Sequence, residues 1–111
     1  MKKLFVLCAV MSLSSSLFAD CGSDKCSDVL VEDIKMSASG DLIFTTSGDE
    51  SRLPCDLVEG NAIRVVKTVP AFQEFYAMLI SAQKSESMVN VRIDEFSESY
   101  QCELLELTAN P

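Results

Sequence analysis

The residues best suited to chemistry in this chain are its cysteines: Cys8, Cys21, Cys26, Cys55 and Cys102. Tetrahedral zinc sites usually combine two short-spaced pairs of Cys or His ligands. This chain instead has one CxxxxC motif, two isolated cysteines and no histidine. A thioredoxin-like redox site would need CxxC at the start of a helix, and the chain has no such motif. In an exported chain, the four cysteines after Cys8 are therefore expected to form two disulfides.

Four cysteines allow three disulfide connectivities. We expect Cys55 to pair with Cys102, and Cys21 with Cys26. The longer bridge would close 48 residues, counting both cysteines. In the chain-entropy description it would stabilise the fold by about 4 kcal/mol, against roughly 2 kcal/mol for the shorter one. The Cys21–Cys26 bridge would be a local clip.

Catalytic groups are harder to find. A nucleophilic Ser or Cys needs a base within hydrogen-bond reach, and without histidine that base must be a lysine or a carboxylate. Lys25, Lys35, Lys67 and Lys84 are all expected in solvent. No glycosidase-like carboxylate pair stands out among the 17 Asp and Glu residues. We therefore expect a protein that is not an enzyme and that needs no cofactor.

A calcium site is one alternative for the acidic residues near the first two cysteines. Asp20, Asp24 and Asp28 could supply oxygen ligands, but the regular D-x-[DN]-x-[DN]-G loop is missing. The sequence therefore predicts no metal site.

Two aromatic residues, Phe96 and Tyr100, lie near a predicted loop. Sugars stack on the faces of aromatic rings, so an exposed Tyr100 would favour a glycan-binding role. Lone aromatic residues also cap cores, and a packed Tyr100 would favour a structural role.

The first residues resemble a cleavable signal peptide. Lys2 and Lys3 supply a positive region, residues 4–13 are apolar, and residues 14–19 are small and end in Leu-Phe-Ala, so we expect cleavage before Asp20. A membrane-spanning helix would need about twenty apolar residues, which this segment lacks. A lipid anchor on the following cysteine is not expected either, because the residue before it is acidic. The mature protein is predicted to be secreted or periplasmic and not inserted in a membrane.

Charge excludes some partners. Without the two leader lysines, 17 acidic residues face seven basic ones, a net charge of −10. A negative field of this size repels phosphate backbones, so nucleic acid and anionic membranes are disfavoured as partners.

The elements that must position these residues form a single domain over residues 20–111. Residues 20–27 are polar and predicted to be a loop. The hydrophobic patterns predict five strands, near residues 29–36, 42–46, 62–67, 89–93 and 102–107. The acidic pair Glu32–Asp33 indicates a bulge or bend in the first strand, and the first two strands read as a hairpin.

One helix is predicted after Pro70, which suits a first helical turn. Its apolar residues recur at helical spacing and should face the core: Phe72, Phe75, Tyr76, Leu79 and Ala82. The resulting order, β-β-β-α-β-β, is that of the OB-fold, a five-stranded barrel with a helix between its third and fourth strands. A small α+β sheet covered by one helix can share this order.

The helix pattern Phe72-x-x-Phe75-Tyr76-x-x-Leu79, the following strand over residues 88–93 and the two predicted disulfides resemble the B subunits of bacterial AB5 toxins. The subtilase cytotoxin type is the nearest, and small uncharacterised exported proteins of Gram-negative bacteria share the pattern. The resemblance implies an OB-fold and pentameric glycan binding. The cysteine spacing departs from that of the toxin subunit, and no sugar-contacting residue can be transferred to this chain.

The sequence is compatible with two functions. One is an exported, non-catalytic binding module for a glycan or a protein partner, which could be a homo-oligomer. The other is a structural or inhibitory protein of the periplasm or envelope without a small ligand.

Overall fold

The computed structural model describes residues 20–95, 97 and 99–109. The expected signal peptide and Phe96 lie outside the described residues. Within them, the chain is mainly β with one α-helix. The elements are β1 (Asp20–Gly22), β2 (Lys25–Val29), β3 (Val31–Met36), β4 (Leu42–Thr46), the 3-10 helix η1 (Glu50–Arg52), β5 (Ile63–Val65), α2 (Phe72–Ser85), β6 (Val89–Ile93) and β7 (Leu104–Ala109).

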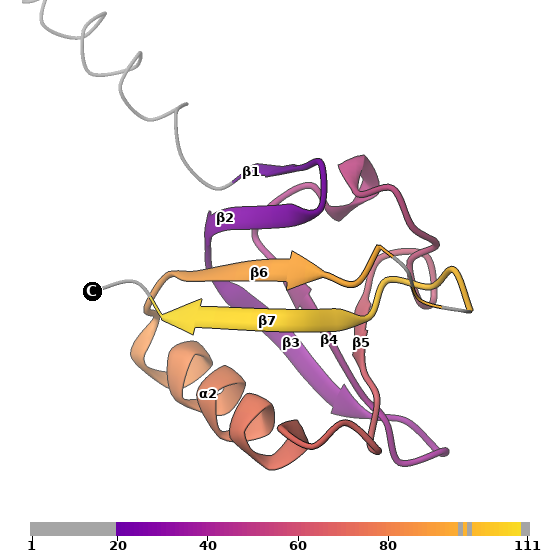
Figure 1. The fold of residues 1–111 in the computed structure, drawn as a ribbon. Coiled ribbons are helices and arrows are strands. Elements are labelled where there is room, and N and C mark those ends of the chain that lie inside the picture. The colour runs from indigo at the N-terminus through magenta and orange to yellow at the C-terminus, as the bar shows by residue number, and fades with distance from the viewer. Residues whose placement is uncertain (1–19, 96, 98, 110–111) are drawn as a thin grey trace, which may run out of the picture.

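The described strands form two antiparallel sheets (Figure 1). One has the order β1-β2-β6-β7 and the other the order β3-β4-β5. Two isolated parallel bridges, Asp56 with Gln101 and Arg64 with Glu103, join the region around β5 to the start of β7. The mainly β class with one helix is confirmed. The predicted strand order β-β-β-α-β-β is wrong, and the described strands do not form a closed barrel.

The main difference from the expected order lies at residues 20–27, which form a hairpin instead of a polar loop. Cys21 lies directly opposite Cys26 in the pairing of β1 with β2. Both cysteines are buried, with 1% and 0% exposure, although their neighbours in sequence are polar. Burial of the cross-strand cysteine pair thus anchors a strand pair that hydrophobic patterning does not reveal.

The predicted first strand is divided at Leu30. Residues before it belong to β2 in the four-stranded sheet, and residues after it belong to β3 in the three-stranded sheet. The pairing of β3 with β4 shifts register between Val31 and Ile34. This irregularity confirms the bulge predicted at Glu32–Asp33.

The remaining strands follow their predicted patterns closely. β3 and β4 form the expected hairpin. In β5, Ile63 and Val65 are buried and Arg64 between them is half-buried. β6 buries Val89, Val91 and Ile93, as its alternation predicts. The last strand begins at Leu104, two residues later than predicted.

Helix α2 packs against β3 and β7 (Figure 1). The stripe of apolar residues that the sequence predicted on one face of this helix is only partly buried. Leu79 and Ala82 are in the core, and Phe72 and Phe75 pack against it. Tyr76, predicted in the core, is 39% exposed, because it lies at the margin of the stripe. None of the helices in the described part of the chain is long and apolar enough to cross a membrane.

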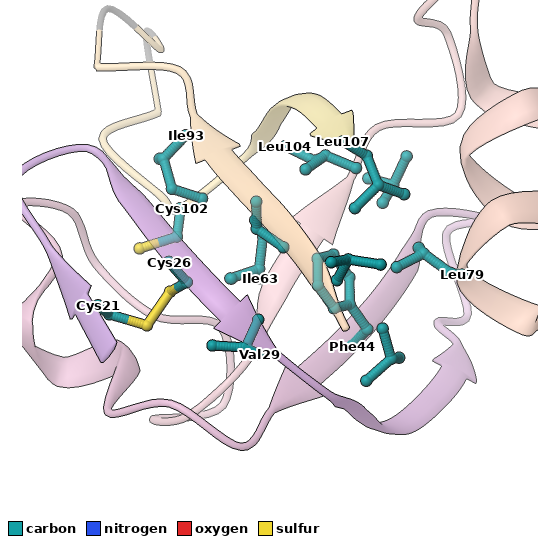
Figure 2. Close-up of a cluster of buried hydrophobic side chains, with 14 of the residues drawn as sticks. Cys21, Cys26, Val29, Phe44, Ile63, Leu79, Ile93, Cys102, Leu104 and Leu107 are labelled. Atoms are coloured by element: carbon teal, nitrogen blue, oxygen red, sulfur yellow. A yellow bond between two sulfur atoms is a disulfide. The ribbon is translucent and has the colours of Figure 1, made fainter. Parts of the chain in front are cut away.

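The core lies between the two sheets and α2. Figure 2 shows side chains from both sheets and from α2 converging in it, including Val29, Phe44, Ile63 and Leu79. The Cys21–Cys26 disulfide lies at one side of this cluster. A separate small cluster of Ile43, Val58 and Ala62 is also buried.

Candidate binding surface

The Cys55–Cys102 disulfide anchors two loops to each other. One loop follows η1, and the other joins β6 to β7. The bonded cysteines are 47 positions apart in sequence, with Cα atoms 5.1 Å apart. The second disulfide joins Cys21 to Cys26. Both pairings are those expected from the sequence.

Backbone hydrogen bonds extend this junction. The N–H of Asp56 donates to the carbonyl oxygen of Tyr100 at 2.8 Å, and the N–H of Cys102 donates to the carbonyl oxygen of Asp56 at 2.8 Å. The N–H of Arg64 donates to the carbonyl oxygen of Cys102 at 2.8 Å. The two loops are therefore held together by covalent and hydrogen bonds on both sides of the disulfide.

Tyr100 is presented outward by this junction. Its side chain is 77% exposed, and its backbone is left-handed, with φ of 59°. Left-handed backbone costs a residue with a Cβ about 1 kcal/mol or more. The N–H of Tyr100 donates to the carbonyl oxygen of Ser97 at 3.2 Å. Its own carbonyl is held by Asp56, so the unfavourable conformation is fixed from both sides.

The residues on either side of Tyr100 in the sequence carry polar side chains. The Ser99 hydroxyl donates to Oε2 of Glu103 at 2.8 Å, and it accepts a bond of 3.3 Å from the N–H of Gln101. Oε1 of Gln101 is buried and has no hydrogen-bond partner among the described residues. Buried polar atoms are normally hydrogen-bonded. Ser99, Gln101 and Glu103 lie close to Tyr100 in the sequence, and hydroxyl, amide and carboxylate groups together with an aromatic face suit a polar ligand that also has an apolar face.

The sequence did not single out Asp56, which holds the carbonyl of Tyr100, or Gln101, which forms a bridge with Asp56. Each is adjacent to a cysteine of the predicted long disulfide. This adjacency was the one signal in the sequence that could have identified them, because a disulfide also brings the neighbours of its two cysteines together.

Two of the three aspartates considered for calcium pair with arginines. Asp20 accepts two bonds from Nη1 of Arg52, at 3.0 and 3.1 Å. Asp24 lies 3.3 Å from Nε of Arg92. The described residues contain no group of three or more acidic, Cys or His side chains that could hold a metal ion.

The lysines considered as bases have other partners or lie in solvent. Lys35 forms an ion pair of 2.7 Å with Glu59, and Nζ of Lys67 donates to the carbonyl oxygen of Ser39 at 2.6 Å. Lys25 and Lys84 are exposed. Neither interaction places a lysine against a candidate nucleophile.

Comparison with known proteins adds no assignment. No family model matches the chain, and no curated protein matches it.

Proposed function

We propose that this protein is an exported, non-catalytic binding module that engages a glycan through the loop bearing Tyr100. The observation that supports this function most strongly is the 77% exposure of Tyr100. Large aromatic side chains usually bury most of their surface. An exposed ring on a strained and well-anchored backbone is more typical of a binding site than of a core cap.

An OB-type barrel is the architecture we propose for this module. Its long, bent first strand would be β2 and β3 together, since they follow one another and contribute to both sheets. The parallel bridge between Arg64 and Glu103 supports adjacency of the third and fifth barrel strands. The helix between β5 and β6 occupies the expected place in the chain.

Export is the second part of the proposal. Two disulfides are typical of an oxidising compartment. Asp20, the residue expected to follow signal-peptide cleavage, lies in β1 and pairs with Ser27 of β2. The intact mass of protein recovered from the periplasm or medium tests this. A chain there that keeps residues 1–19 would contradict it.

Self-association, as the resemblance to toxin B subunits implies, belongs to the same proposal. Within the three-stranded sheet, β3 pairs only with β4, and Met36 at its end is 52% exposed. A second copy could cover such an edge. Light scattering of the oxidised protein decides it: a mass several times that of one chain supports association, and a monomer at high concentration contradicts it.

The direct test of function is a glycan array probed with the oxidised, exported protein. The matched variants are Tyr100→Ala and Tyr76→Ala, each of which removes one exposed tyrosine ring. Glycan binding by the wild type and by Tyr76→Ala, with loss in Tyr100→Ala, supports the proposal. An empty array would favour the structural or inhibitory envelope protein instead.

A further inference from the structure

A pocket of about 380 Å³ lies on the face of the three-stranded sheet, apart from Tyr100. Strands β3 and β4 and the turn after Val58 line it. Ile43 and Ala62 contribute aliphatic surface, and Asp33, Lys35, Glu59 and Asn61 contribute polar groups. Its volume lies at the lower end of the range for small-molecule pockets, so it suits a single side chain or a small ligand.

Two backbone irregularities meet at this pocket. The β3 bulge contains Asp33, and bulges commonly redirect side chains next to functional sites. On the opposite wall, Glu59 and Gly60 are both left-handed, with φ of 55° and 85°. The N–H of Asn61 donates to the carbonyl oxygen of Val58 at 3.2 Å, which closes a turn of the type I′ kind.

A glutamate is an unfavourable residue for the first of these left-handed positions, where Asn, Asp or Gly is preferred. The turn nevertheless places the Glu59 carboxylate at the pocket, 2.7 Å from Nζ of Lys35. The side-chain carboxylate of Asp33 has no hydrogen bond or ion pair with any described residue. With one lysine and two carboxylates, the lining has a net charge of −1.

We propose that this pocket receives an arginine side chain from a protein partner. The aliphatic stem would lie against Ile43 and Ala62, and the guanidinium would pair with Asp33 and with the oxygen of Glu59 that Lys35 leaves free. The net charge of −10 expected for the chain without its leader attracts a basic partner and adds to the local charge. The amide of Asn61 supplies a further hydrogen-bonding group at the rim.

The test is a titration of the oxidised, isotope-labelled protein with Nα-acetyl-L-arginine N-methylamide, followed by NMR of the backbone amides. The control ligand is the citrulline analogue, which has nearly the same shape without the charge. We expect saturable shifts at Asp33, Lys35, Thr45 and Asn61 with the arginine compound, weakened by added salt. No shift at these amides, or equal affinity for the citrulline compound, would overturn the proposal.

Two charge-matched variants locate the site. Asp33→Asn should weaken binding roughly three- to fivefold, the range for a partly exposed charge pair. Glu106→Gln removes the same charge from β7 in the other sheet and should leave the affinity unchanged. Equal effects of the two variants would mean that only net charge matters, which contradicts a defined site. Both variants retain Tyr100, so failure of this proposal and failure of glycan binding are separate results.

Discussion

The backbone N–H of Asp56 donates to the carbonyl oxygen of Tyr100 across a distance of 2.8 Å. These residues are far apart in sequence, and the adjacent Cys55–Cys102 disulfide brings their loops together. The position of Tyr100 therefore depends on a crosslink as well as on hydrogen bonds. Loss of the disulfide should affect stability and binding together.

The first prediction compares the two disulfides. Replacing Cys55 and Cys102 with Ala should lower the free energy of unfolding by about 2 to 5 kcal/mol, because the bridge closes the longer loop. Replacing Cys21 and Cys26 with Ala should lower it less. Denaturant melts of both double variants measure the difference. A larger loss in the Cys21/Cys26 variant would show that burial of that pair outweighs loop closure.

The second prediction concerns Gly48, which lies against the short disulfide. A Cβ at Gly48 would come within 2.9 Å of Sγ of Cys21 and 3.0 Å of Cγ1 of Val29. Both neighbours are buried, so Gly48→Ala should lower the free energy of unfolding by about 1 to 3 kcal/mol. Gly22→Ala is the control, since a Cβ there meets no atom within 4 Å. Equal melts of the two variants would refute this close packing.

The third prediction separates the contribution of Tyr100 to the stability of the fold from its contribution to glycan binding. Tyr100→Gly removes a ring that is 77% exposed and relieves the left-handed backbone. The free energy of unfolding should stay unchanged or rise by up to about 1 kcal/mol, while the affinity for the glycan falls. Thermal or chemical melts check this. A clear loss of stability would identify Tyr100 as a packed turn residue.

The sequence predicted elements whose hydrophobic residues follow a regular period. The alternation in Val89, Val91 and Ile93 identified β6 because one face of that strand is buried. The cysteine count and spacing led to the two disulfide pairings, and the acidic pair in β3 led to the bulge.

Other features depend on contacts that no local pattern encodes. The β1–β2 hairpin is too short for a periodic signal, and only the cross-strand contact of Cys21 with Cys26 reveals it. The division of the first strand at Leu30 depends on which sheet each half joins. The pocket combines a bulge in β3 with a turn at Glu59, segments that meet only in the folded chain.

The most direct test of glycan binding at Tyr100 is isothermal titration calorimetry with the glycan that binds most strongly on the array. Tyr100→Phe keeps the aromatic face and should bind nearly as well as the wild type. Tyr100→Ala should lose about 1 to 2 kcal/mol of binding free energy, roughly a five- to thirtyfold loss of affinity. Equal affinities of the Ala variant and the wild type would contradict stacking on Tyr100 and, with it, the proposed site.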